Sequence, residues 1–316
     1  MNRLQLIEEI RDILAKAGFY LSERHYEPGI SFDVIARKDD SLLIIRALIN
    51  ADSSRSKNAT ELKVLSNALN GSSLLIAVKG GRRKLKKGVI YSRRGLPLIS
   101  VDTLKDMLIE GVPPYVFSAP GGFYVDLDSE LLKKVREDNR ISLSKLAKIA
   151  GVSRKAIQKY EQGMGADLDI ALRLEEFLGE ELILPLNPLE YDEEIEDSIE
   201  SLEQFTGYSK SIFESLLSMG YRIVPTCRCP FEAVTSDEKT ILLSGIGSEE
   251  NQNLKKKAKI VSDLSHITEK ESVIFLKKRY TRVNLEGTPL IDMSELTGID
   301  SKEAIKELLK ERKEAK

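Results

Sequence analysis

The sequence has little of what a disulfide or a metal site requires. Its 316 residues include only two cysteines and two histidines. Cys227 and Cys229 stand one residue apart, and a zinc site needs about four ligands, so only His25 and His266 could complete one. We therefore expect no metal and no cofactor. Both cysteines are interpreted as small, half-buried residues beside a strand.

Long apolar runs are also missing. No stretch reaches the roughly 18–20 apolar residues of a membrane span. The first residues, MNRLQLIEEIRDIL, have the spacing of an amphipathic charged helix and lack the apolar core of a secretory signal peptide. We expect no membrane partner and a cytoplasmic location. The length is about twice that of a typical domain, which predicts two or three domains.

The formal net charge is −2, but the charges are segregated along the chain. Residues 190–204 hold eight acidic side chains and no basic one, whereas residues 129–165 hold nine Lys or Arg against four Asp or Glu. Residues 82–94 hold seven basic side chains and no acidic one. Such a chain can present a basic face to phosphate groups. For residues 82–94 a solvated loop is an equally open interpretation.

Residues 143–162, LSKLAKIAGVSRKAIQKYEQ, satisfy the steric demands of a helix-turn-helix. Ala147 is small where the second helix crosses the first, and Gly151 supplies the positive φ of the tight turn. Ser153 is placed to cap the second helix. The positions that should face the shared core are apolar: Leu146, Ala150, Val152, Ile157 and Tyr160. An ordinary helical hairpin is the alternative.

The flanks of this motif predict further helices. Asp128 or Ser129 can cap a helix that carries Leu131, Leu132 and Val135 on one face. After the motif, Asp167 or Asp169 can open a helix that stops near Gly179 and carries Leu172, Leu174, Phe177 and Leu178. A compact all-α bundle is expected.

Residues 129–185 resemble the phage-repressor/Cro class of helix-turn-helix domains, above all in SRKAIQKYEQG. The resemblance implies that the second helix enters the major groove of DNA. Arg154, Lys155 and Lys159 would read bases, with Gln158 at the margin. The class often has a Gln opening the first helix, where this chain has Leu143. The expected DNA-binding residues are Ser144, Ser153, Arg154, Lys155, Gln158 and Lys159, with Lys145 as the alternative to Ser144.

Two parts of the chain resemble each other on either side of the motif. Three blocks align without gaps and in the same order: 31–45 with 230–244, 63–69 with 259–265, and 95–104 with 287–296. We interpret them as two copies of one α/β domain around the DNA-binding module. Each copy is expected to contain a helix, a hairpin, a second helix and a buried strand, with Lys38-Asp39-Asp40 as the first hairpin turn.

The order of elements in each copy resembles the restriction-endonuclease-like fold, in particular archaeal Holliday junction resolvases. In those enzymes a Glu on the first helix, an Asp ending a hairpin strand and a Glu-x-Lys on the next strand hold Mg²⁺. Glu9 and Asp33 fit the first two roles, and Glu232 aligns with Asp33. The third site should fall in residues 45–48, Ile-Arg-Ala-Leu, or in Ser-Gly-Ile-Gly of the second copy. Without these groups we expect no enzyme activity.

The whole arrangement resembles a family of archaeal HTH-type transcriptional regulators. The expected architecture is a multidomain α+β chain with a repressor/Cro-type bundle between two related α/β domains. The expected parts are a degenerate nuclease-like domain at 1–118, the DNA-binding domain at 129–185, an acidic linker at 186–207 and a second α/β copy at 208–316. The expected function is sequence-specific regulation of transcription by a homodimer on double-stranded DNA, with an unidentified effector as a further partner. A nuclease-like enzyme targeted by its helix-turn-helix and a protein-interaction scaffold are the alternatives.

Overall fold

The computed structural model describes residues 1–24, 29–190, 202–248, 251–278, 280 and 282–314. Internal contacts divide the chain into two compact units. The first comprises Met1–Ile13, Leu48–Ser54 and Leu74–Asp192, and the second comprises Leu14–Ala47, Arg55–Ser73 and Glu193–Lys316. Half of the predicted acidic linker, 186–207, lies outside the described residues, namely residues 191–201. Of this stretch, the described part includes a 3-10 turn at Leu202–Gln204.

The first sheet has the strand order β1-β2-β3-β4-β7-β6-β8-β9-β10, with β5 paired to β4. Its strands are β1 (Tyr20–Leu21), β2 (Val34–Lys38), β3 (Ser41–Asn50), β4 (Ser72–Gly80), β5 (Arg83–Lys84), β6 (Val89–Arg93), β7 (Leu96–Ile99), β8 (Val116–Ala119), β9 (Gly122–Val125) and β10 (Ala166–Asp167). The helices among them are α1 (Arg3–Lys16), α2 (Ser56–Leu69) and α3 (Val101–Lys105), which continues as a π-helical turn, Asp106–Glu110.

The predicted hairpin between β2 and β3 is confirmed. Lys38 pairs with Ser41, so Asp39 and Asp40 form a two-residue turn, and Asp39 adopts a φ of 50°. Asp and Asn tolerate this left-handed conformation better than most residues. Residues 42–45 of β3 are all buried, as a continuous apolar run predicts for a strand covered on both faces.

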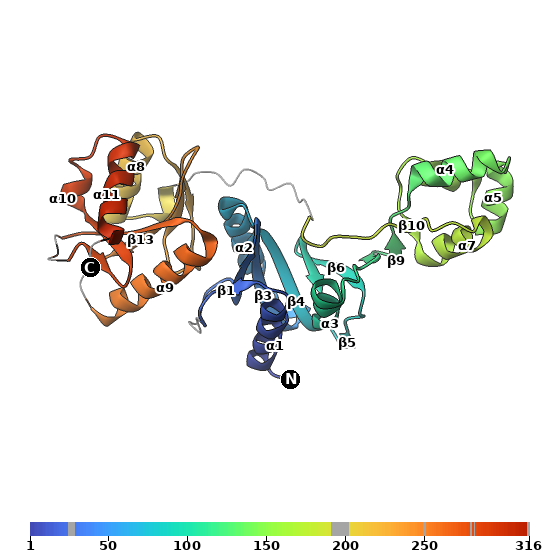
Figure 1. The fold of residues 1–316 in the computed structure, drawn as a ribbon, viewed down its shortest axis with the longest axis horizontal. Coiled ribbons are helices and arrows are strands. Elements are labelled where there is room, and N and C mark those ends of the chain that lie inside the picture. The colour runs from blue at the N-terminus through green and yellow to red at the C-terminus, as the bar shows by residue number, and fades with distance from the viewer. Residues whose placement is uncertain (25–28, 191–201, 249–250, 279, 281, 315–316) are drawn as a thin grey trace. The chain divides into compact units, whose positions relative to one another are not determined.

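Four helices form the bundle that carries the predicted DNA-binding motif: α4 (Ser129–Asp138), α5 (Leu143–Ala150), α6 (Arg154–Tyr160) and α7 (Leu168–Leu178). Figure 1 shows α4, α5 and α7 gathered beside β9 and β10. Their shared core includes fully buried side chains from each helix: Leu132, Leu146, Ile157 and Leu174.

The first sheet continues into this bundle through short strands. Strand β6 runs parallel to β8, with Val89 opposite Val116, and β8 turns back into β9 at Pro120 and Gly121. Strand β9 then pairs with β10, Ala166 lying opposite Val125, directly before α7. Backbone hydrogen bonds therefore join the strands of the α/β part to the entrance of the helical part.

The C-terminal part contains a six-stranded sheet of order β11-β12-β13-β14-β16-β15. Its elements are α8 (Tyr208–Ser218), β11 (Arg222–Pro225), β12 (Ala233–Ser236), β13 (Ile241–Gly247), α9 (Gln252–Thr268), β14 (Glu271–Leu276), β15 (Asn284–Leu285), β16 (Thr288–Asp292), α10 (Met293–Leu296) and α11 (Lys302–Glu314). Successive side chains of a strand point to opposite faces of the sheet, so the core consists of two separate clusters. Val273 and Phe275 pack with α8 and α11, whereas Ile274 and Leu276 pack with α9.

The two sheets have the same register in their matching strands. In the antiparallel pairs, Val34 lies opposite Ile45 and Ala233 opposite Ser244, so both members differ by 199 positions. The parallel pairs also match, because Leu75 lies beside Leu98 and Ile274 beside Leu290. These pairs agree with the first and third aligned blocks, whose members differ by 199 and 192 positions.

The middle block of the alignment, however, is wrong by three residues. Helix α2 ends at Asn70 with a φ of 55°, and α9 ends at Glu269 with a φ of 52°, again 199 positions apart. The match of 63–69 with 259–265 implies a difference of 196. A shift of three residues nearly completes a helical turn, so apolar positions still fall on apolar positions. The helix pattern alone therefore did not fix the register, whereas the strands did.

Candidate nucleic-acid interface

The turn of the helix-turn-helix forms as the sequence predicts. Helix α5 ends at Gly151, which has φ 72° and ψ 32°, and the Gly151 N–H donates to the Ala147 carbonyl. The backbone N–H of Val152 donates to the same carbonyl at 2.9 Å. Ser153 then caps α6, its Oγ accepting a hydrogen bond from the Ala156 N–H at 3.1 Å. The left-handed residue and the cap together set the angle between the two helices.

The predicted core positions of the motif are confirmed with one difference. Leu146, Ala150 and Ile157 are fully buried, and Ala147 and Tyr160 are 5% exposed. Val152 is only partly buried at the edge of the core. Burial raises the pKa of the Tyr160 hydroxyl, as does the charge of Asp167 to a smaller degree. The motif thus packs as a unit rather than as an isolated hairpin.

The structure brings the predicted DNA-binding side chains to the surface. All six are exposed: Ser144, Ser153, Arg154, Lys155, Gln158 and Lys159. The four that belong to α6 lie on the face opposite Ile157 and Tyr160, which are buried in the core. Within the described part of the chain, Arg154, Lys155 and Lys159 take part in no ion pair. Three cations therefore project from one short helix with their charges uncompensated.

An ion pair missed by the sequence analysis holds the end of this helix. Arg136 of α4 donates to both carboxylate oxygens of Glu161, which follows α6, and its Nη2–Oε2 distance is 3.1 Å. The two side chains are 12% and 9% exposed. Arg136 also donates to the Ile141 carbonyl, and its hydrogen bond to Glu161 is the main cause that raises the Arg136 pKa. The pair connects α4 to the C-terminal end of α6.

A signal for this pair was present in the sequence. Arg136 lies four residues after Leu132, so it falls on the stripe that buries Leu132 and Val135. A charged side chain on a buried stripe requires a partner of opposite charge. The partner is 25 residues away, and helix periodicity cannot identify it.

The flanking caps are now defined, and two apolar residues of the predicted second flanking helix lie largely outside the core. Asp128 caps α4 by accepting from the Leu131 N–H, and Asp167 caps α7 by accepting from the Asp169 N–H. On α7, Ala171 and Leu174 are buried, but Leu172 is 49% exposed and Phe177 is 39% exposed. The apolar residues of α7 cover more than one face, so only part of them reaches the core. The Lys145 ammonium lies 5.9 Å from the centre of the Phe177 ring.

The predicted nuclease-like position Asp33 is occupied by contacts within the protein. Its carboxylate accepts the Ala47 N–H at 2.8 Å and lies 3.6 Å from the Arg46 guanidinium. Arg46 also donates to the Ile30 carbonyl at 2.7 Å. Arg46 stands on β3, in the stretch where the resemblance requires a metal-binding carboxylate. A fixed cation beside Asp33 opposes a divalent cation there.

Glu232 occupies the matching position in the C-terminal part and shows the same pattern. It accepts the Ile246 N–H at 2.6 Å, and the Lys257 ammonium binds both of its carboxylate oxygens at 2.6 Å. Lys257 donates in addition to the Ile246 carbonyl at 2.8 Å. Asp33 and Glu232 are therefore joined to equivalent residues of the next strand, and each has a basic neighbour. Glu9 lies partly buried on α1.

The two cysteines differ in their exposure. Cys229 is half-buried as predicted, but Cys227 is exposed, contrary to the prediction. Burial is the main cause that raises the pKa of the Cys229 thiol well above its usual value. Within the described residues, which exclude His25, no group of three or more His, Cys, Asp and Glu side chains is close enough to hold a metal ion.

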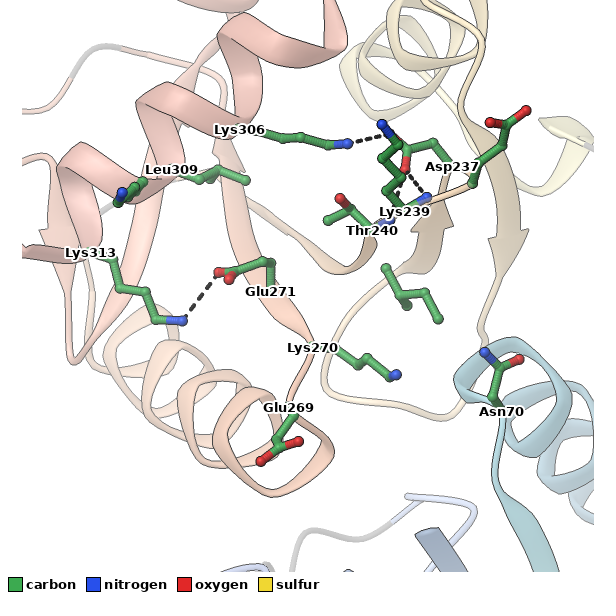
Figure 2. A pocket seen from close by; sticks show the side chains of 13 residues that line it. Asn70, Asp237, Lys239, Thr240, Glu269, Lys270, Glu271, Lys306, Leu309 and Lys313 are labelled. Atoms are coloured by element: carbon green, nitrogen blue, oxygen red, sulfur yellow. Dashed lines mark hydrogen bonds and ion pairs between the residues drawn. The ribbon is translucent and has the colours of Figure 1, made fainter. Parts of the chain in front are cut away.

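A cavity of about 650 Å³ is lined mostly by the C-terminal part, at α11 and the turn before β13, and also by Asn70 at the end of α2. Figure 2 shows the Lys306 ammonium bonded to Asp237, at 2.8 Å, and the Lys313 ammonium bonded to Glu271, at 3.2 Å. The hydrogen bond from Lys306 is one of the contacts that lower the Asp237 pKa. The lining as a whole holds five lysines and four acidic residues. Because these charges nearly cancel, the net charge of the lining favours neither an anionic nor a cationic ligand.

None of the described helices is long and apolar enough to cross a membrane. The fold and the exposed cations of α6 define the class of the protein: a helix-turn-helix protein whose DNA-binding module is attached to an α/β domain. Two family models agree with this division. Residues 3–114 match the PD-(D/E)XK superfamily domain, and residues 132–183 match a helix-turn-helix family. No solved structure matches the chain.

Relatives are similar over their full length. A protein of Methanosarcina barkeri is 37% identical over 323 residues, covering 99% of this chain and 98% of its own. A protein of Natronomonas pharaonis is 36% identical over 318 residues, covering 99% and 100%. Both carry the name "Putative HTH-type transcriptional regulatory protein". The chain belongs to this family of archaeal HTH-type transcriptional regulatory proteins.

Proposed function

We propose that the protein regulates transcription by binding specific duplex DNA through α6 in the major groove. The observation that carries this proposal is the set of uncompensated cations, Arg154, Lys155 and Lys159, on the exposed face of a fully formed helix-turn-helix. A plain helical hairpin would have no need of these charges, whereas the phosphates of duplex DNA attract them. The names of the relatives support the same function.

The residues of the motif divide between two tasks. Arg154 and Lys155 at the start of α6 are placed to donate to guanine O6 and N7, with Lys159 one turn further on. Gln158 lies between them and suits adenine. Ser144 and Ser153 stand at the N-terminal ends of α5 and α6, where hydroxyl and backbone N–H groups suit phosphate oxygens. Base contacts give specificity, and phosphate contacts fix the register.

Arg154→Ala and Lys155→Ala are each expected to weaken binding to a preferred site by about 1–3 kcal/mol, because each removes a base contact. The preferred duplex is first selected from a random pool with the parent protein. Gel shifts then compare the selected duplex with a scrambled one at two salt concentrations. Binding to the scrambled duplex should change much less.

Lys133→Ala is the matched control, since Lys133 is an exposed cation of α4 in the same bundle. It should leave the discrimination between the two duplexes unchanged. The proposal fails if no sequence is enriched from the pool. It also fails if both α6 variants bind the selected duplex as tightly as the parent does.

We further propose that the protein acts as a homodimer. One short recognition helix contacts only a few base pairs, which gives too little specificity over a genome. A two-fold dimer doubles this contact and places its half-sites about 34 Å apart. Leu172 of α7 is apolar and 49% exposed, and it supports a contact between the bundles of two copies. In a footprint of the selected duplex, the parent should protect two segments one helical turn apart.

For the two α/β parts, we propose two copies of one domain, both without nuclease activity. The equal strand registers support the duplication, and the ion pairs at Asp33 and Glu232 support the lack of catalysis. Both carboxylates already accept a backbone N–H and form an ion pair with a cation. Neither β3 nor β13 supplies the carboxylate and lysine that a metal-dependent nuclease of this type uses.

The parent protein is expected to leave branched and linear duplex DNA intact in the presence of Mg²⁺. Cleavage products are measured on end-labelled substrates over several hours, with Asp33→Asn and Glu232→Gln run in parallel. A trace of activity that persists in both variants would identify a contaminating nuclease. Mg²⁺-dependent cleavage that Asp33→Asn or Glu232→Gln abolishes would overturn the proposed lack of catalysis.

A further inference from the structure

Strands β4 and β5 are joined by the most basic segment of the chain. Residues 79–87, KGGRRKLKK, contain six lysines and arginines and no acidic residue. Lys79 pairs with Lys84, and Gly80 pairs with Arg83, so Gly81 and Arg82 form the tip of the turn. We call residues 79–87 the basic hairpin.

Only two of the six cations of the basic hairpin contact an acidic or aromatic side chain among the described residues. The Lys87 ammonium lies 2.9 Å from the Asp106 carboxylate, and the Lys86 ammonium lies 4.3 Å from the centre of the Phe123 ring. The other four cations, as far as the described residues extend, make no ion pair: Lys79, Arg82, Arg83 and Lys84. Arg82, Arg83 and Lys84 are exposed, and Lys79 is half-buried.

The pairing places like charges opposite each other. Lys79 and Lys84 are direct cross-strand partners, and like charges in this position destabilise a sheet. A carboxylate at either position would relieve the repulsion, and neither position has one. The arrangement is unfavourable in the free protein and becomes favourable once an anion lies between or beside the two ammonium groups.

The tip is held in place by a side chain from another strand. The Asn50 Oδ1, at the end of β3, accepts the Gly81 N–H at 3.0 Å, and the Asn50 Nδ2 donates to the Gly81 carbonyl at 3.4 Å. Gly81 adopts a φ of 61°, which glycine tolerates without strain. The Leu85 N–H continues the pairing by donating to the Val78 carbonyl. Because the loop is already ordered, binding a ligand costs little conformational entropy.

We propose that the basic hairpin binds the phosphate backbone of the duplex whose bases α6 reads. This inference rests on the proposed function. Duplex DNA fits because it offers closely spaced phosphates to the closely spaced cations of the hairpin. The hairpin and the helix-turn-helix belong to one compact unit, and one sheet runs from β4 through β7, β6, β8 and β9 to β10. The protein therefore contacts DNA through two elements of one compact unit, the basic hairpin and α6.

The test compares the parent with the triple variant Arg82→Gln/Arg83→Gln/Lys84→Gln on the selected duplex. Each lost phosphate contact reduces the slope of log K against log salt by about 0.9, so three contacts reduce it by about 2.7. The ratio of parent to variant affinity should then fall roughly 40-fold between 50 and 200 mM salt. The preference for the selected over the scrambled duplex should remain unchanged.

A matched variant, Lys239→Gln/Lys256→Gln/Lys310→Gln, removes three exposed lysines of the C-terminal part and changes the net charge equally. It should keep the slope of the parent, which separates local contacts from long-range attraction. Hydroxyl-radical footprints should lose protected backbone positions in the hairpin variant alone. Circular dichroism and thermal unfolding verify that both variants are folded.

Two outcomes overturn the inference while leaving the proposed function intact. The first is an unchanged salt slope and footprint in the hairpin variant, with sequence-specific binding preserved. The second is an unchanged duplex slope together with lost binding to a structureless RNA of equal length, which would assign the hairpin to RNA. If the parent prefers no sequence at all, the proposed function itself fails, and the inference fails with it.

Discussion

Replacing Arg136 by Met is expected to destabilise the helix-turn-helix bundle by about 3–5 kcal/mol. The change keeps an unbranched apolar stem but leaves the Glu161 carboxylate, 9% exposed, without its cation, and such an uncompensated buried charge is costly. Hydrogen exchange of the α4 and α6 amides in the full chain measures the effect. Protection there should fall by two orders of magnitude or more, and specific DNA binding should weaken with it.

The double variant Arg136→Met/Glu161→Leu is the critical control. Replacing both members of a buried pair by apolar residues is often neutral, so most of the lost protection should return. Lys133→Met, on the exposed side of the same helix, should have almost no effect. A single variant as stable as the parent would show that the pair does not hold the end of α6. A double variant no better than the single one would assign the loss to packing of the long arginine stem.

Gly151→Val is expected to cost about 2–3 kcal/mol and to abolish specific binding. The reason is the backbone, because Gly151 has a φ of 72°, and a β-branched residue tolerates this conformation poorly. Space is not the cause. A Cβ at Gly151 would meet the Arg173 guanidinium at 3.8 Å, an ordinary contact. Thermal unfolding and hydrogen exchange of α5 and α6 measure the change.

A graded series at this position distinguishes the conformational cause. Gly151→Asn should be mildest, since asparagine enters the left-handed region most readily, Gly151→Ala intermediate and Gly151→Val most severe. Hydrogen exchange in the C-terminal sheet should be unchanged in all three variants. If alanine and valine cost the same, or if valine is tolerated, then the left-handed turn does not determine the geometry of this module.

The parts of the structure that the sequence predicts best depend on local chemistry. Gly151, Ser153 and the apolar positions around them act within a few residues of one another, so the motif could be placed to within a residue. The hairpin at Asp39 was found for the same reason. The strand blocks could be aligned because a one-residue slip would have moved every side chain to the opposite face.

The sequence analysis failed where two interacting residues are far apart in the chain, or where a helical pattern fits more than one alignment. Helices α2 and α9 could be aligned three residues out of register because a helix nearly repeats after three or four positions. The partners of Arg136 and Glu232 are set by packing between separate elements, which no local pattern encodes. The apolar residues of α7 predict a helix but not which of its faces becomes buried, and Leu172 lies on the exposed side.

The pairing of β9 with β10 has a consequence for exchanging this module between proteins. Strand β10 lies inside the helix-turn-helix segment 129–185, while its partner β9 precedes that segment, and Leu127 bridges to Ile183 across the same boundary. A transplant of residues 129–185 alone would sever these ladders and leave two open strand edges, which favour aggregation. A cassette beginning at β8 would carry the paired strands β8 and β9 with it. Crossovers between members of the family should therefore fall before β8 and not between β9 and α4.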